Sequence, residues 1–488
     1  MYSRLVKNTA IFIFVGFITL ICVFIIDADT ALIAAPIAAT LSIAFFFWQT
    51  LCHRRGEIPL ADAGTLTVLA TAFYTVIPPL QFWLSGMQHT TLSAWQLYIL
   101  APSPREFAAL TWWYVVYLLC FVLGYLVFDT KTKRSTVIPR PPDQATIMSL
   151  LLLFMILSGT MFAIRSFYGI DLYGVYDIEK MYVAYETLLN MPLAFRQFYG
   201  IIGHNGVLLI IKLAILIIVF LNWKKNVYRL SFYVWIFTLV VSNILWMGAR
   251  TDFVLMSIAS AILYHRFVKP LKPVPILLGG TGLLVLFLMI GLMRGSANID
   301  TNLENFSDIR QSSQTIFSTS NEFDALFGGN YDLLQMKQTG ILGEVPLQFR
   351  LYDLVMLIPQ QILPYEKLDV QEWYVSRSHI PGFFMFNPIS QSIIGFGWVE
   401  LIFRGLFLGF LFAKLRAWYV RRDSSFWPTL LYFYLVIISY YTIRGTALYM
   451  LFASVLFRFI PLYLIVRLLA NRKRPQVNNL LLPLAPRR

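Results

Sequence analysis

Apolar residues along this chain come in continuous blocks whose length matches the thickness of a bilayer. A helix needs about 20 apolar residues to cross the hydrocarbon core. The blocks are unbroken runs rather than the alternating strands of a barrel, and backbone groups in lipid must pair within their own segment, so the pattern predicts helices. About twelve spans are predicted, at residues 9–26, 31–50, 64–84, 109–128, 146–164, 204–221, 231–247, 252–268, 274–293, 395–413, 427–443 and 447–467.

Composition and charge then define the class and the orientation. The chain is 58% hydrophobic and 13% charged, and the apolar blocks cover it throughout, so residues 1–488 are expected to form one transmembrane domain. The most basic loops all fall on one side: "CHRRGE", "KTKRSTVIPR", "NWKKNVYR", "HRFVKPLK", "KLRAWYVRR" and "RLLANRKR". The positive-inside rule places that side, and both termini, in the cytosol. These loops account for the net charge of +14, so no nucleic-acid partner is expected.

Two of the loops on the predicted outer side are long. One covers residues 165–203, and the other, over residues 294–394, carries more acidic than basic residues. Within the second loop, "RLYDLVMLIPQQILP" is too short to span a membrane and too apolar for a free loop. We therefore expect an in-plane or re-entrant helix near residues 350–364, ending near Pro359.

Six arginines fall at predicted outer helix ends or beside apolar segments: Arg250, Arg294, Arg350, Arg377, Arg404 and Arg444. Arginine keeps its proton, and its planar fork matches two phosphate oxygens at once. Together these residues would suit a lipid-linked diphosphate. For any single arginine the alternative is a side chain that extends to the lipid headgroups or pairs with an acid. Asp353, three residues after Arg350 on the same helical face, is one such acid.

Other polar residues on the predicted outer side leave several roles open. His379 could accept a proton from a sugar hydroxyl or be an exposed loop residue. Asp252 is favoured as the N-terminal cap of the eighth span over a chemical role, and "DAD" at residues 27–29 as a tight turn over a cation-binding pair. The five histidines show no metal-ligand spacing, and there is no P-loop. No metal or cofactor is expected, and the substrate must arrive already activated.

Four segments, in order along the chain, carry a resemblance to a known family. They are "MGARTDFVLM", "LYDLVMLIPQQILPYEK", "FNPISQSIIGFGWVELIFRGLFLGFL" and "TIRGTALYMLFASVLFRF". They give an outer arginine between two mid-chain spans, an aromatic and apolar segment with proline in the large loop, a small-residue turn before a helix, and an arginine that opens the last spans. In this arrangement the chain resembles the Wzy-type polysaccharide polymerases.

The resemblance implies a reaction and a site. A growing glycan would move from undecaprenyl diphosphate onto the terminal sugar hydroxyl of a lipid-linked repeat unit, with inversion and without a metal, in a GT-C-like helical bundle. By position, Arg250, Arg350, Arg377 and Arg444 match the family's outer arginines, and with Arg294 they are the expected diphosphate-binding residues. Many members carry a glutamate ahead of the "FGW" turn where this chain has "PISQS". The candidate catalytic bases are therefore His379, Asp353 and Glu400.

The resemblance also implies a place and partners. The protein would be a multi-pass protein of the bacterial inner membrane with its site facing the periplasm. It would contact undecaprenyl-diphosphate-linked oligosaccharide and membrane lipids, and a chain-length regulator protein is a candidate partner. Two alternatives stay open: an O-antigen ligase or polyprenyl-phosphate-sugar glycosyltransferase, and a flippase or transporter of lipid-linked oligosaccharide. The chain shows no internal repeat, which weighs against the transporter.

Overall fold

The structure is a computed structural model, and most of the residues that it describes are in helices. It describes residues 28–53, 62–84, 103–129, 138–169, 187, 190–202, 206–246, 250–272, 278–280, 282, 327–358, 362–378 and 386–472. In these ranges there is no strand. Six helical segments in them are long and apolar enough to cross a membrane: Ile33–Leu51, Ala63–Leu80, Pro104–Phe128, Gln144–Phe167, Gly200–Leu221 and Ala447–Asn471. The chain is therefore a helical protein with several candidate spans.

The number of twelve spans stays a prediction. The expected first span, at 9–26, lies outside the described residues, and the one at 274–293 is described only at 278–280 and 282. The expected tenth span coincides with α20 (Trp398–Val420), which is long enough to cross but carries four charged residues, Glu400, Arg404, Lys414 and Arg416. Charges in a span normally face the protein interior, and three of these four form ion pairs inside the protein.

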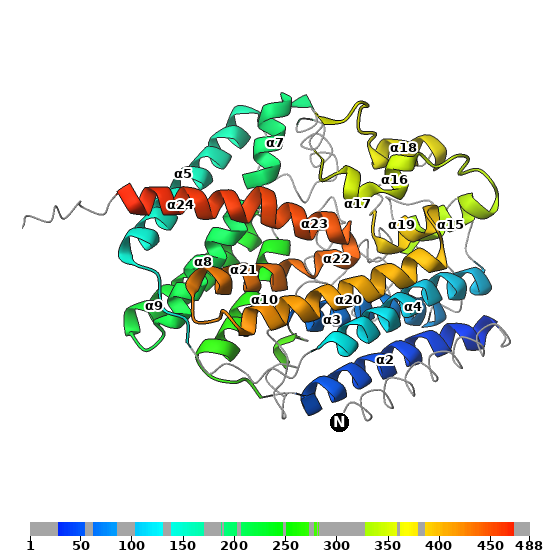
Figure 1. Cartoon of the computed structure of the whole chain (residues 1–488), viewed down its shortest axis with the longest axis horizontal. Coiled ribbons are helices and arrows are strands. Elements are labelled where there is room, and N and C mark those ends of the chain that lie inside the picture. The colour runs from blue at the N-terminus through cyan, green and yellow to red at the C-terminus, as the bar shows by residue number, and fades with distance from the viewer. Residues whose placement is uncertain are drawn as a thin grey trace, which may run out of the picture.

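One group of four helices packs around α4 (Pro104–Phe128). The other three are α2 (Ala28–His53), α3 (Ala63–Leu84) and α20, and Figure 1 shows α2, α4 and α20 side by side. Helices α4 and α20 run in the same direction. Trp398, the first residue of α20, stacks on Trp113 in the third turn of α4, and Arg416 near the end of α20 pairs with Asp129 at the end of α4.

Glycine lets α4 and α20 touch through their backbones. A Cβ added at Gly409 would lie 2.2 Å from the carbonyl oxygen of Phe121, and one added at Gly124 would lie 2.2 Å from that of Leu406. At Gly405 it would lie 2.8 Å from the Cβ of Cys120. Small residues at such contacts are typical of membrane helices, whose association depends on close van der Waals packing.

A buried ion cluster holds the last turns of α4 and α20 to the start of α3. Arg416 Nη1 lies 2.6 Å from Asp129 Oδ1, and its Nε lies 3.6 Å from Asp62 Oδ2. The hydroxyl of Tyr125 donates to the same Asp62 oxygen at 2.5 Å. Asp62 also caps α3, because its Oδ1 accepts from the backbone N–H of Gly64 at 2.8 Å. This cluster lies at the end predicted to face the cytosol.

A second group of helices packs beside the first. It contains α5 (Gln144–Phe167), α7 (Leu193–Ile202), α8 (Val207–Leu221), α9 (Asn226–Trp246), α10 (Arg250–Phe267), α21 (Phe426–Ile438) and α22 (Tyr441–Arg444). The last span begins as α23 (Ala447–Ala453) and continues through the π-helical η4 (Ser454–Phe459) into α24 (Ile460–Arg472). Helix α8 is almost entirely buried, in keeping with a sequence that is apolar on nearly all sides.

Five short helices lie over the end of the bundle where α4 and α20 begin (Figure 1). They are α15 (Gly329–Gln338), α16 (Leu347–Arg350), α17 (Tyr352–Val355), α18 (Val370–Ser378) and α19 (Pro388–Ile394), and we call them the roof. The expected in-plane or re-entrant helix near 350–364 stays a prediction: α17 lies in that range and α16 ends at its start, while residues 359–361, with Pro359, lie outside the described part. Tyr331 of α15 donates to Glu106 of α4 at 3.0 Å, which attaches the roof to the bundle.

Candidate functional site

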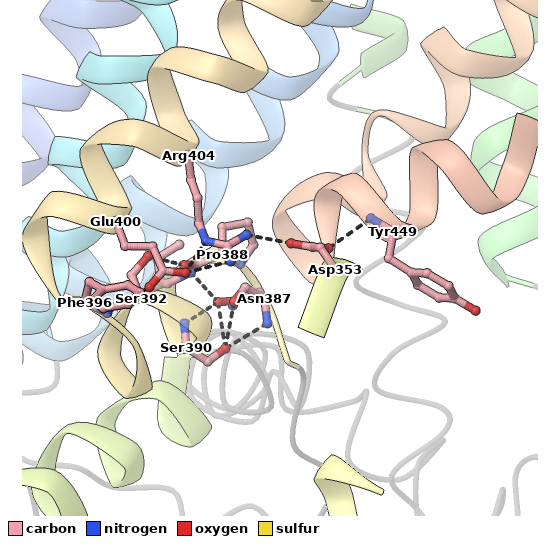
Figure 2. Close-up of polar contacts among 10 residues, drawn as sticks. Asp353, Asn387, Pro388, Ser390, Ser392, Phe396, Glu400, Arg404 and Tyr449 are labelled. Carbon is pink, nitrogen blue, oxygen red and sulfur yellow. Dashed lines mark hydrogen bonds and ion pairs between the residues drawn. The ribbon is translucent and has the colours of Figure 1, made fainter. Parts of the chain in front are cut away.

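A buried ion cluster lies where the roof meets α20 (Figure 2). Arg404 is its centre: Nη1 lies 2.6 Å from Asp353 Oδ2, and Nη2 lies 2.7 Å from Glu400 Oε1. Nε of the same guanidinium donates to Glu400 Oε1 at 2.8 Å. Asp353 belongs to α17, so the cluster joins a roof helix to α20 across 51 residues of sequence.

The turn before α20 positions Glu400. Gly397 takes a φ of 68°, which side-chain-bearing residues rarely adopt, and Glu400 Oε2 accepts from the backbone N–H of Phe396 at 2.9 Å. A Cβ at Gly395 would lie 2.0 Å from that Glu400 oxygen. The two glycines of "GFGW" are therefore needed for the carboxylate to fold back over the start of its own helix.

Asp353 has a second contact, which reaches the last span. Its Oδ1 accepts from the backbone N–H of Tyr449 at 2.9 Å, as Figure 2 shows. Tyr449 is in the first turn of α23, where backbone N–H groups have no partner within the helix. A carboxylate at this position is favoured by the positive end of the helix dipole. One aspartate thus connects α17, α20 and α23.

The three charged side chains of this cluster are largely shielded from water. The side chains of Arg404, Asp353 and Glu400 are 13%, 5% and 10% exposed. In the described part of the chain, each carboxylate has one oxygen on Arg404 and the other on a backbone N–H. Such an arrangement fixes the position of two of the candidate bases, Asp353 and Glu400, at the junction of roof and bundle.

The roof carries three cations, Lys337 of α15, Arg350 of α16 and Arg377 of α18. Arg350 and Arg377 are both exposed, and no ion pair of either is found among the described residues. The guanidinium of Arg377 lies over Gly343, 3.5 Å from where a Cβ would be. Nζ of Lys337 donates to the carbonyl of Ile393. Burial, and then the positive charge of nearby Arg350, lower the pKa of Lys337, while Glu400 raises it. Like charges held close together suit an anionic ligand.

The remaining residues expected in the site are placed as follows. Arg444 ends α22 just before α23, is half-buried, and has its guanidinium 5.5 Å from the centre of the Tyr440 ring. Helix α10 begins at Arg250, but the side chains of Arg250 and Asp252 lie outside the described part. Arg294 and His379 lie outside the described residues altogether.

Arg404, one of the six expected outer arginines, pairs with acids, and its spacing of four from Glu400 is the signal for an ion pair along one helix. Two contributors to this region, Lys337 and Asn387, were not among the expected site residues. Lys337 carried no sequence signal. Asn387 caps α19, with its Oδ1 accepting from the N–H groups of Ile389 and Ser390, both at 2.9 Å. Asparagine, then proline at the first helical position, is the sequence signal for that cap.

Together the apolar helices and the inward-facing ion pairs define a multi-pass membrane protein of the all-helical class. No protein-family model matches this chain, and no curated protein or solved structure matches it either.

Proposed function

We propose that this protein is a polysaccharide polymerase of the bacterial inner membrane that acts on glycans linked to undecaprenyl diphosphate. One observation carries the proposal: Lys337, Arg350 and Arg377 all belong to the roof, Arg350 is near enough to Lys337 to lower its pKa, and the two arginines are exposed with no ion pair in the described ranges. A diphosphate at the membrane surface presents the oxygens that such cations bind. Arg444 at the start of the last span adds a fourth cation near this end.

The resemblance to the Wzy-type polymerases implies the reaction. The oxygen of an acceptor sugar hydroxyl attacks C1 of the sugar at the reducing end of the growing glycan. The bond between C1 and the diphosphate oxygen breaks, and undecaprenyl diphosphate leaves with the electron pair. The arginines and Lys337 stabilise the charge that develops on the leaving diphosphate. The acceptor proton goes to a base, for which Asp353, Glu400 and His379 are the candidates.

The bundle contributes position and exclusion of water. Attachment of the roof to α4 and α20 holds the cations over the membrane end of the helices, where a polyprenyl chain in the lipid would present its diphosphate. Holding the two substrates in position in this way can lower the activation barrier of the transfer by several kcal/mol. No nucleotide-binding loop is needed, because the lipid-linked donor is already activated.

Gene deletion and complementation test the proposal. Cells without the gene should make surface polysaccharide of one repeat unit, which a gel separates from the long chains of the parent. Complementation with the Arg350→Ala, Arg377→Ala double variant should give short chains at normal protein level. Loss of one charged hydrogen bond costs about 1.5–3 kcal/mol, which is about a 10-fold to 150-fold lower transfer rate.

The matched control is Arg467→Ala, an exposed arginine near the other end of the last span, and long chains should persist there. Long chains in the deletion strain would refute the polymerase. Loss of even the first repeat unit from the surface would identify a flippase instead. Long chains in the double variant would refute the role of the roof cations.

A further inference from the structure

Three buried amide side chains meet where the roof touches α4. Asn330 of α15 and the α19 cap Asn387 are both 0% exposed, and Gln391, one turn further along α19, is 1% exposed. Nδ2 of Asn330 donates to the hydroxyl of Tyr114 at 2.5 Å and lies 3.4 Å from Asn387 Oδ1. Asn387 and Gln391 lie on the same face of α19 because they are four residues apart. The amides therefore form one group.

Three polar atoms of this group lack a protein partner. In the described part of the chain, Asn330 Oδ1 and both amide atoms of Gln391 are buried without a hydrogen bond, whereas the side chain of Asn387 also contacts the hydroxyl of Tyr114. Exchanging the assigned oxygen and nitrogen of these side-chain amides does not give every buried atom a hydrogen-bond partner. Asn387 must keep its oxygen on the N–H groups that it caps, and Asn330 must then present its NH₂ to that oxygen. Gln391 is unpaired in either orientation.

The hydroxyl of Tyr117 extends this group toward the ion cluster around Arg404. It is buried and has no hydrogen-bond partner within the ranges that the structure describes. Tyr117 lies one turn after Tyr114 on α4, and its hydroxyl is within electrostatic range of Arg404 and Asp353. Unpaired polar atoms therefore lead from the amides to the residues proposed to act in the reaction.

Buried polar atoms without partners are rare, because each loses its hydrogen bonds to water and regains none. Several in one place indicate that something other than the chain binds them. The set offers NH₂ donors, carbonyl acceptors and a hydroxyl that can do both, and none of them is charged. The matching ligand group both donates and accepts without a charge, and a hydroxyl group does so.

We infer that α4, α15 and α19 enclose a binding site for the hydroxyl groups of a neutral sugar, with Asn330, Asn387, Gln391 and Tyr117 as its polar contacts. The inference rests on the proposed function and deepens it, because the sugar would be the one next to the diphosphate of the lipid-linked substrate. Since the amides are 0 to 1% exposed, α15 and α19 must move away from α4 to admit the sugar. Ordered water is the other source of such hydroxyl contacts.

The test uses the purified full-length protein in phospholipid nanodiscs and follows its thermal unfolding midpoint. Two probes are added: undecaprenyl diphosphate alone, and the lipid extract of the gene-deletion strain, which holds sugar-linked diphosphates. The variants are Gln391→Leu and Tyr117→Phe. The control is Gln49→Leu, a 5% exposed amide on α2 whose Nε2 is likewise unpaired in the described part.

Undecaprenyl diphosphate should raise the midpoint of all four proteins equally. The extract should raise it further in the wild type and Gln49→Leu, and should add nothing in Gln391→Leu and Tyr117→Phe. Without a probe, the unfolding midpoint of Gln391→Leu should be no lower than that of Gln49→Leu.

If both site variants respond to the extract as the wild type does, the sugar site is wrong, and the proposed polymerase function is unaffected. A much lower midpoint of Gln391→Leu without a probe indicates internal water and also overturns the site. If neither probe shifts the wild type, the proposed function fails together with the inference.

Discussion

Replacing Arg404 by methionine should destabilise the protein strongly. The substitution keeps much of the side-chain volume but leaves two carboxylates without their common cation. Asp353 and Glu400 are only 5% and 10% exposed, so water cannot replace the guanidinium at contacts of 2.6 and 2.7 Å. Removal of one partner from a buried ion pair costs about 3–5 kcal/mol. Here the loss should fall in that range, with α17 detaching from α20 first.

A matching triple variant distinguishes two causes of the lost stability: the missing attraction to Arg404, and the buried negative charges of Asp353 and Glu400 that are left without a cation. Arg404→Met combined with Asp353→Asn and Glu400→Gln removes all three charges, while the amide oxygens still accept from Tyr449 and Phe396. Replacement of a whole buried ion pair by neutral groups is often close to neutral. We expect the triple variant to recover most of the 3–5 kcal/mol that the single variant loses, to within about 1–2 kcal/mol.

Unfolding in mixed micelles with increasing denaturing detergent measures the free energy of unfolding for each protein. Arg229→Met serves as the control, because Arg229 is an exposed arginine that contacts only backbone carbonyls among the described residues. A loss below about 1 kcal/mol for Arg404→Met, the value of an exposed pair, would refute the buried cluster. A triple variant no more stable than the single one would refute the charge argument.

Three further predictions follow from the helix contacts, the α19 cap and the roof. Gly409→Ala should lower the free energy of unfolding by about 1–3 kcal/mol, because its Cβ meets backbone atoms, whereas Gly159→Ala, with open space around it, should not. Asn387→Ala should cost about 1 kcal/mol through loss of the α19 cap, measured in the same titration. Burial, and then Arg350, lower the pKa of Lys337 in the folded protein, so the unfolded chain holds more protons as pH rises through that pKa toward about 10.4. Wild type should gain stability over this window relative to Lys337→Met, and parallel curves of stability against pH would contradict the lowered pKa.

Sequence alone predicts the helices of this protein better than their contacts. The expected span at 31–50 lies within Ala28–His53, and the one at 64–84 coincides with Ala63–Leu84. Length and unbroken hydrophobicity are local properties, so they can be read directly from the chain. The same holds for the break at Arg250, where a new helix begins.

The contacts of Asp353 show why the site could not be predicted in the same way. Spacing along the chain suggested Arg350 as its partner, three residues away. In the structure its carboxylate meets Arg404, 51 residues away, and the backbone of Tyr449, 96 residues away. Partners at such separations depend on how the roof packs on the bundle, and no periodic pattern records that packing. The burial of the Asn330 and Gln391 amides could not be predicted from the sequence for the same reason.

The close contact of α4 with α20 has a consequence for the order in which the protein is assembled. Asp129 precedes its partner Arg416 by 287 residues, so α4 enters the membrane long before the helix that neutralises its carboxylate. A slip of one helical turn, about 5.4 Å, would strand that carboxylate and bring larger side chains against Gly124 and Gly409. The register of α4 against α20 is therefore fixed both by the Asp129–Arg416 ion pair and by the small size of the glycines. A chain released before residue 398 would expose the unneutralised carboxylate of Asp129 and an uncovered Gly124 on α4, two marks of unfinished protein for membrane quality control.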